Sequence, residues 1–338
     1  MKLSGLSLLA LVTSLMSCSN ELDLLNIADP IPVVYFVMNP DEPAYHLTLT
    51  KSLSGVGNGY DLAHDPDRVF YQSADIRMEG WMNEYKVWEE KFNLTDKIKN
   101  PGIFPESPGY CYESPNDFYP NQNVGILPNG YHQITHFRLV LNLEGALGPI
   151  LATIPLIPMP QRKFPATPLK VLDINPDGSN YKAVIKFDPD YVKYCELVCL
   201  FRYQEYQYDK TWLDYSVTFQ LRKNIMIIDD EAATFIDSDL FLNKLAVNIK
   251  PVNDTITRKF KSLDLIFYVG DQNYADYNNS YINTGNNDAP PIGNISNGYG
   301  MFTMARTIKI EKNMIMSPRT LELVSSSAIT KKLGFVRW

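Results

Sequence analysis

Histidine and cysteine are both scarce in this chain, with four of each among 338 residues. These side chains supply most transition-metal ligands and much of acid–base catalysis. His132 and His136 lie four residues apart, a spacing that suits a metal site on a helix. The residues that follow (HFRLVLNL) have a strand pattern, and on a strand the two rings would be ~13 Å apart. We therefore predict surface or loop-edge histidines, no metal site and no cofactor.

The common catalytic signatures are also missing. The sequence contains no GxSxG, no HExxH, no GxxxxGK[ST] and no GxGxxG after a strand. Asp229-Asp230-Glu231 is a carboxylate cluster without the spacing of a calcium loop, so we interpret it as a solvated acidic turn. The main prediction is a protein that is not an enzyme. Paired glycosidase carboxylates can lie far apart in sequence, and a hydrolase with dispersed carboxylates stays an alternative.

An excess of positive charge is absent as well. There are 31 Lys and Arg against 38 Asp and Glu, a formal net charge of −7. A nucleic-acid partner is not expected, because duplex binders carry a basic footprint. The one long apolar run, Leu6–Met16, is too short to cross a ~30 Å hydrocarbon core.

That run has the features of a secretory signal. It follows Met1-Lys2 and leads into Leu15-Met16-Ser17-Cys18, which resembles the bacterial lipobox, with Met16 as a departure. We predict a signal peptide over 1–17, lipidation of Cys18 and a tether over 18–28. The acyl chains would hold the protein in the outer membrane, since each buried CH₂ contributes ~0.8 kcal/mol. The alternative is a plain signal peptide with an incidental cysteine.

The residues after Cys18 bear on where the protein is located in the cell envelope. Glu21 and Asp23 make the start of the tether acidic. In Bacteroidota lipoproteins such a stretch resembles a surface-export signal. Exposure at the cell surface is therefore expected, with an ordinary tether as the alternative.

Three cysteines remain after the anchor. Cys195 and Cys199 alternate with other residues in YCELVCLFRY, so on a strand both thiols lie on one face, too far apart for a disulfide. We interpret them as small buried apolar residues. Whether Cys111 pairs with one of them stays open.

The composition indicates a mainly β protein, with 21 Tyr, 16 Phe and 23 Pro. Strand patterns separated by short turns favour two immunoglobulin- or fibronectin-like β-sandwich domains in tandem. Three prolines between Pro155 and Pro160 place a stiff linker over 156–165, between domains at 29–155 and 166–338. The Pro-, Gly- and Asn-rich stretch 100–130 is predicted to be a loop whose trimming leaves the fold intact.

Strand patterns recur along both halves. The clearest are PVVYFVM at 32–38, YHLTLTK at 45–51, ADIRMEGW at 74–81, LDLIFYVG at 263–270 and MFTMARTIKIEK at 301–312. The segment 229–248 is compatible with a short helix or a strand pair. Residues 273–297 have the composition of a polar loop.

Aromatic residues gather in two places that we select as candidate ligand or partner surfaces. Rings beside polar residues suit sugar stacking or protein docking, because they offer an apolar face and a polar edge. The first group is Trp81, Tyr85 and Trp88, and the second is Tyr203, Tyr206, Tyr208, Trp212 and Tyr215. Tyr274, Tyr277 and Tyr281 fall in the polar loop. The alternative is that these tyrosines pack at sandwich edges.

Several stretches, taken in order, resemble one family of Bacteroidota outer-membrane lipoproteins, known only as domain of unknown function four-two-four-nine. They are VVYFVMNPDEPAYHLTLTKSLS, SADIRMEGW, LGPILATIPLIPMP, the segment Phe235–Phe241 and the segment Gly293–Phe302. Tyr299 and the long 100–130 stretch depart from the family pattern. The resemblance implies no activity. It implies an accessory partner of a TonB-dependent transport barrel.

The segment Gly293–Phe302 (GNISNGYGMF) has a structural explanation of its own. Gly298 and Gly300 permit positive φ, and Asn294 and Asn297 can bond to their own backbone, so we predict a turn that determines the fold. The function expected is a non-enzymatic binding or accessory subunit of a TonB-dependent nutrient-uptake system. The alternative is a stand-alone glycan- or peptide-binding surface lipoprotein.

Overall fold

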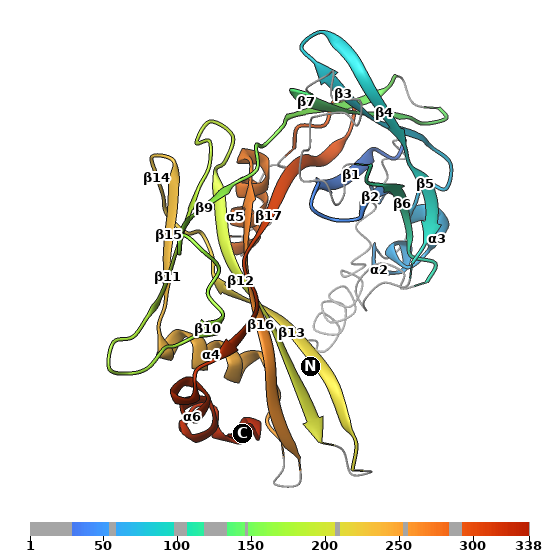
Figure 1. Cartoon of the computed structure of the whole chain (residues 1–338). Helices are drawn as coiled ribbons and strands as arrows, with labels where there is room; N and C mark the ends of the chain where they lie inside the picture. The colour runs from blue at the N-terminus through green and yellow to red at the C-terminus, as the bar shows by residue number, and fades with distance from the viewer. Residues whose placement is uncertain are drawn as a thin grey trace, which may run out of the picture.

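The computed structural model describes residues 29–53, 59–97, 107–117, 134–145, 148–206, 210–252, 256–283 and 293–337. Cys18 and the signal peptide lie outside these ranges, as do His132 and Tyr208. The described part of the chain is mainly β, as predicted, with three sheets arranged as sandwiches (Figure 1).

The largest sheet has nine strands in the order β13-β12-β16-β17-β1-β2-β6-β5, with β10 also paired to β17. Their bounds are β1 Pro32–Met38, β2 Ala44–Lys51, β5 Asn93–Asp96, β6 Tyr110–Pro115, β10 Val171–Leu172, β12 Tyr194–Tyr206, β13 Trp212–Arg222, β16 Thr257–Gly270 and β17 Tyr299–Met316. Period-two burial along β1 and β2 places Phe36 and Leu47 in the core, as their alternating sequences predict.

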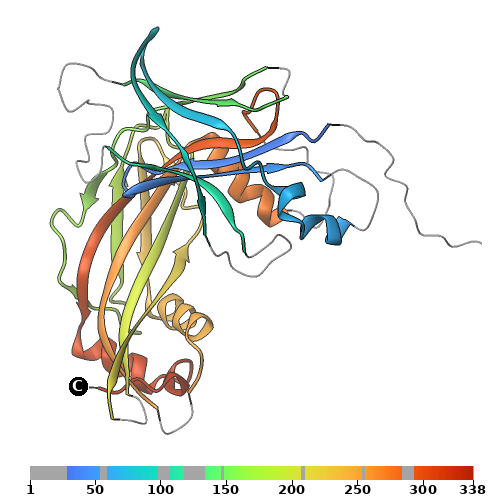
Figure 2. The same cartoon turned by 90° about the vertical axis from the view of Figure 1, so that its right-hand side faces the viewer.

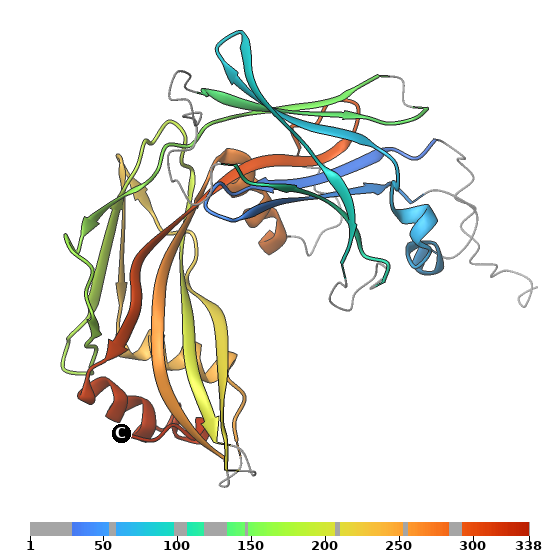
Figure 3. The same cartoon turned by 45° about the vertical axis from the view of Figure 1, so that its right-hand side comes forward.

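Two four-stranded sheets cover the two ends of this large sheet. One has the order β4-β3-β7-β8 and forms the first sandwich with β1, β2, β5, β6 and the start of β17. The other has the order β14-β15-β11-β9 and forms the second sandwich with β12, β13, β16 and the rest of β17 (Figure 3). Their bounds are β3 Asp75–Met82, β4 Tyr85–Lys91, β7 His136–Asn142, β8 Ile150–Pro155, β9 Gln161–Phe164, β11 Tyr181–Lys186, β14 Ile227–Ile228 and β15 Glu231–Ile236.

Strand β17 belongs to both sandwiches. From Tyr299 to Met304 it runs parallel to β1, and from Ala305 onwards it pairs with β16. Phe302 of β17 stacks on Phe36 of β1, with ring centroids 5.1 Å apart. The boundaries expected from the sequence, 29–155 and 166–338, differ from the structure here, because 299–304 complete the sheet of the first half. Without this strand, β1 would pair with β2 alone and would become an edge of the sheet.

The helices lie at the ends and at the junction of the sandwiches. They are α2 Gly59–Ala63, α3 Pro66–Val69, α4 Ser238–Asn248, α5 Gln272–Asn283 and α6 Pro318–Ser326, followed by a 3₁₀ turn at Lys331–Leu333. Figure 2 shows α4 and α6 at the end of the second sandwich that is distant from the first. No helix in the described ranges has the length and apolarity that a membrane span requires.

Helix α5 corrects the prediction of a polar loop at 273–297. The Asp271 carboxylate caps this helix by accepting a hydrogen bond from the Tyr274 amide at 2.9 Å. Asparagine-rich composition favours loops, but a well-formed N-cap and a buried Ala275 outweigh it here.

Strand β6 corrects the prediction that 100–130 is a dispensable loop. Ser114 and Tyr112 of β6 are 0% and 2% exposed, and the strand lies between β2 and β5. Asn116, just after β6, donates to the carbonyl oxygens of Pro40 and Glu42. Trimming the whole stretch would remove a central strand of the first sandwich, so we expect it to destabilise the fold.

The three described cysteines are free and buried. Cys195 and Cys199 lie on one face of β12, opposite Val269 and Leu265, as the alternation predicts. Burial raises the pKa of both thiols, so they remain protonated. Cys111 pairs with neither.

Candidate functional site

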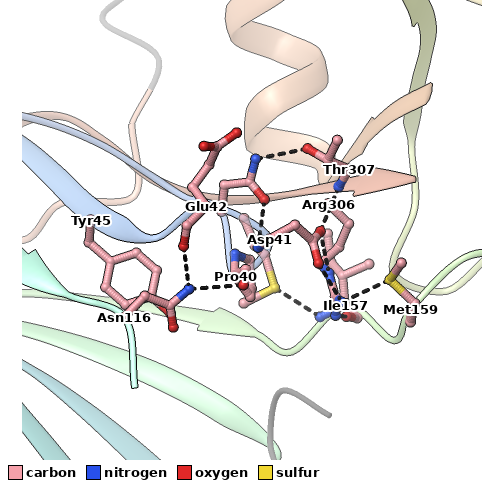
Figure 4. Close-up of polar contacts among 11 residues, drawn as sticks. Pro40, Asp41, Glu42, Tyr45, Asn116, Ile157, Met159, Arg306 and Thr307 are labelled. Carbon is pink, nitrogen blue, oxygen red and sulfur yellow. Dashed lines mark hydrogen bonds and ion pairs between the residues drawn. The ribbon is translucent and has the colours of Figure 1, made fainter. Parts of the chain in front are cut away.

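The junction of the two sandwiches is built around one buried ion pair, Asp41 with Arg306 (Figure 4). The Arg306 Nε and Nη2 atoms each donate to a different Asp41 carboxylate oxygen at 3.1 Å. The side chains of Arg306 and Asp41 are 1% and 9% exposed. Arg306 Nη1 also donates to the Ile157 carbonyl oxygen at 3.1 Å, which attaches the chain between β8 and β9 to β17.

The turn after β1 presents Asp41 to this arginine. The Asp41 amide donates to Asn39 Oδ1 at 3.1 Å, an Asx turn that the Asn-Pro sequence favours. Asn39 Nδ2 donates to Thr307 Oγ1 at 2.9 Å, and the Thr307 amide donates to Asp41 Oδ2 at 2.7 Å. The turn is therefore attached to β17 at three points.

A groove of about 610 Å³ lies beside this turn. Its apolar lining includes Pro40, Pro43, Leu200 and Ile266. Its polar lining includes Glu42, Thr218, Tyr268 and Lys309, besides the paired Asp41. The volume falls within the ~300–1,000 Å³ typical of small-molecule sites.

Three ionisable groups of the groove make no hydrogen bond or ion pair with other described residues. They are the Glu42 carboxylate, the Lys309 ammonium group and the Tyr268 hydroxyl. Figure 4 shows the Glu42 carboxylate turned away from the Asp41–Arg306 pair. Burial, and next to it the charge of Glu42, raises the pKa of Tyr268, which therefore remains a hydrogen-bond donor. The groove can thus offer an anion, a cation and a phenol to a ligand.

The first aromatic group does not form one platform. Trp88 faces the core and packs edge-on against Phe137, with ring centroids 6.2 Å apart. Trp81 stacks on His136, and the Arg138 guanidinium lies 4.3 Å from its ring centroid. Tyr85 is 71% exposed. The three rings share a hairpin, but they do not share a binding face.

The second group forms ring pairs across the β12–β13 hairpin. Tyr203 stacks on Tyr215 at 5.6 Å, and Tyr206 meets Trp212 at 5.1 Å. Tyr203 is 9% exposed and also packs against Phe335. Tyr206 and Trp212 are half-buried. The structure brings these four rings together in pairs but covers part of them.

The third set lies on helix α5 rather than in a loop. Tyr274 packs edge-on against Tyr194 at 5.2 Å, and Tyr277 meets Tyr35 of β1 at 6.3 Å. These tyrosines attach the helix to the large sheet. The side chain of Tyr281 is outside the described part.

The predicted turn segment, Gly293–Phe302, connects the first sandwich to β17. Asn294 Oδ1 accepts from the Phe302 amide at 2.9 Å, and Asn294 Nδ2 donates to the Phe302 carbonyl oxygen at 2.8 Å. Asn297 has a positive φ of 57° and donates to the Pro149 carbonyl oxygen before β8. Asn294 thus bonds to backbone within the segment, whereas Asn297 reaches beyond it to the residue before β8.

Glycine is required at the two glycine positions of this segment for different structural reasons. Gly300 has φ +101°, and a Cβ there would lie 1.9 Å from the Val34 carbonyl oxygen. Gly298 has no positive φ, which corrects the prediction. A Cβ at Gly298 would instead approach the Pro32 carbonyl oxygen at 2.9 Å.

The acidic cluster is a turn between β14 and β15. Asp230 pairs with Lys186 at 2.7 Å, and Glu231 pairs with Lys163. Within the described ranges, no three His, Cys, Asp or Glu side chains lie close enough together to hold a metal ion.

Sequence reasoning missed both the groove and Arg306. Arg306 lies in an alternating strand pattern, where an arginine normally faces solvent. The one available signal was the NPDEP turn, whose Asp41 needs a partner. Nothing local identifies that partner, which is 265 residues away.

Comparisons with known proteins add little to this geometry. No known family and no curated protein matches the sequence. Among solved structures, the C-terminal globular domain of an oligosaccharyltransferase from Pyrococcus abyssi is 11% identical, with a TM-score of 0.21 over 62% of this chain. The match spans 40% of that chain, less than half its length. CBD12 from CALX1.2 is 8% identical, with a TM-score of 0.16 over 81% of this chain and 98% of that chain.

Proposed function

We propose that this chain is a non-enzymatic outer-membrane lipoprotein, anchored through Cys18 and exposed at the cell surface. In this proposal it is a binding or accessory subunit of a TonB-dependent nutrient-uptake system. The observation that carries the binding role is the groove at the junction, which is lined by both apolar and polar side chains and includes ionisable groups that make no ion pair with other described residues.

The buried ion pair supports this role because it preorganises the groove. Asp41 and Arg306 connect the turn that lines the groove to the strand shared by both sandwiches. A ligand that meets a prearranged site loses less free energy to ordering.

The lipid anchor supports the accessory role. The tether of residues 18–28 spans at most about 40 Å when fully extended. Anchoring confines the domains to a thin layer and raises their effective concentration against a neighbouring barrel. A weak contact with that barrel would then be enough to hold the two together.

The test is a pull-down of C-terminally tagged protein from native membranes in mild detergent, with partners identified by mass spectrometry. We expect a near-stoichiometric TonB-dependent barrel. An unrelated tagged lipoprotein of the same membrane serves as the control. If no barrel is enriched over that control, the accessory role is wrong.

A stand-alone glycan or peptide binder is the second candidate. It is favoured by the half-buried Tyr206–Trp212 ring pair, which lies where β12 ends and β13 begins. In that case a glycan array should show binding that Trp212→Ala removes and Tyr85→Ala leaves unchanged.

A further inference from the structure

The groove beside Asp41 contains two opposite charges that do not neutralise each other. Glu42 and Lys309 both line it, and no ion pair joins them. Both side chains are exposed. In a mildly acidic protein, an ammonium group without a salt bridge in a groove is available for a ligand carboxylate.

The strand register sets the positions of these groups. Tyr268 faces Thr307 across the β16–β17 pair, and Ile266 faces Lys309. Each facing pair forms one row across the two strands. The two rows are about 7 Å apart along the strand direction, because each strand advances by two residues between them. Lys309 therefore stands beside Ile266, and Glu42 lines the groove from the turn after β1.

The groove is lined by aliphatic and polar side chains in similar measure. Leu200 and Ile266 from the large sheet and Pro40 and Pro43 from the turn after β1 supply apolar surface to it. Tyr268 is the one aromatic ring among the described lining residues, so the groove lacks the paired rings on which sugars stack. A ligand that fits must carry an amine, a carboxylate and an apolar or neutral body.

From this arrangement we infer that the groove binds short peptides with free termini. The ligand's ammonium group would meet the Glu42 carboxylate, its carboxylate would meet the Lys309 ammonium group, and its backbone could accept a hydrogen bond from Tyr268. A single amino acid would leave most of the 610 Å³ unfilled. The inference rests on the proposed binding role and names the ligand class for it.

The test uses the full-length lipoprotein in mild detergent and a random dipeptide library in four forms, because the ends of a dipeptide lie about 7 Å apart. The forms have free ends, an acetylated N-terminus, an amidated C-terminus, or both ends blocked. Equilibrium dialysis with mass spectrometry measures the retained peptides. We expect each block to weaken binding about tenfold, the size of a lost hydrogen bond to a charged group.

Two variants test which groove residue binds each end of the peptide. Glu42→Gln should remove the effect of acetylation and keep the effect of amidation, and Lys309→Gln should do the reverse. Lys312→Gln, on β17 but outside the groove lining, is the matched control and should behave as the unmodified protein.

The inference is overturned if no form of the library is retained, if blocking the ends changes nothing, or if a neutral glycan is retained in place of peptides. Each of these results is independent of the accessory role, which a separate experiment tests. The barrel pull-down contains no added peptide and reports only whether a barrel co-purifies.

Discussion

Arg306 and Asp41 form a bidentate ion pair across 265 positions of sequence, with both N–O distances at 3.1 Å. The pair joins the turn after β1 to the strand that both sandwiches share. Because Arg306 also donates to Ile157, a single guanidinium holds three separate parts of the chain.

Removing this arginine should destabilise the protein strongly. Arg306→Met leaves the Asp41 carboxylate buried without its partner, which typically costs about 3–5 kcal/mol. Urea unfolding followed by circular dichroism measures the free energy of unfolding. Arg319→Met is the matched control, because Arg319 and its partner Asp177 are 65% and 75% exposed. The control should change stability by less than about 1 kcal/mol. Equal losses in the two variants would show that the buried pair is not important.

Gly300 should tolerate no side chain. Gly300→Ala places a Cβ 1.9 Å from the Val34 carbonyl oxygen, at a residue with φ +101°. The parallel β1–β17 pairing would have to shift, in addition to backbone strain of about 1–3 kcal/mol. Gly145→Ala is the control, since Gly145 has φ +80° and a Cβ there would meet no described atom within 4 Å. Thermal melts should show a clearly larger loss for Gly300→Ala. Similar melting temperatures would mean that the close approach is relieved at little cost.

The buried Glu311 should make stability depend on pH. Its side chain is 0% exposed, it accepts from the Tyr181 hydroxyl at 2.8 Å, and Arg162 lies 3.6 Å away. Burial raises the pKa of this carboxyl above its usual value despite Arg162. A raised pKa in the folded state stabilises the protein below the unfolded-state pKa, and this contribution is lost as pH rises through the folded-state pKa.

Glu311→Gln cannot ionise, so its stability relative to the unmodified protein should increase between about pH 4 and pH 7. Urea unfolding at both pH values measures this difference. Glu113→Gln is a control with the opposite expectation, because the hydrogen bond from Lys97 lowers the pKa of Glu113. Its stability relative to the unmodified protein should decrease over the same pH range. The assignment fails if Glu311→Gln instead loses relative stability as the pH rises.

Cys18→Ala should release the protein from membranes. The thiol of Cys18 is the proposed site of acylation, and without acyl chains nothing predicted from the sequence would hold the mature chain to a bilayer. Fractionation in high salt, followed by blotting, gives the distribution between membrane and soluble fractions. Cys111→Ala is a control that should remain with the membranes, since that thiol is buried in the fold. Membrane retention of Cys18→Ala in high salt would contradict the anchor.

The strands were the most predictable part of the fold. The pattern PVVYFVM predicts β1 with its bounds at Pro32 and Met38, because β-branched and aromatic residues with a following Asn-Pro turn specify a strand locally. Strand β6 and helix α5 were missed for the opposite reason. Their composition favours loops, and their order comes from distant contacts such as that of Asn116 with Pro40.

The candidate site was much less predictable. The aromatic groups were selected from their spacing, yet the sheets divide Trp81, Tyr85 and Trp88 between a core-facing ring, a stacked ring and an exposed ring. The groove combines Glu42, Ile266 and Lys309 from three distant segments. No local pattern in the sequence relates those segments.

The sequence by itself determined the local features of this protein. These are most of its strands, the Asn-Pro turn after β1 and the buried faces of β1 and β12. Each depends on residues within a few positions of one another, where alternation and turn chemistry act directly. The tertiary structure decided that β1 pairs with β17, that Arg306 lies beside Asp41, and that a groove opens there. Such contacts depend on how the whole chain closes on itself, and their energies exist only when segments hundreds of residues apart have been brought together.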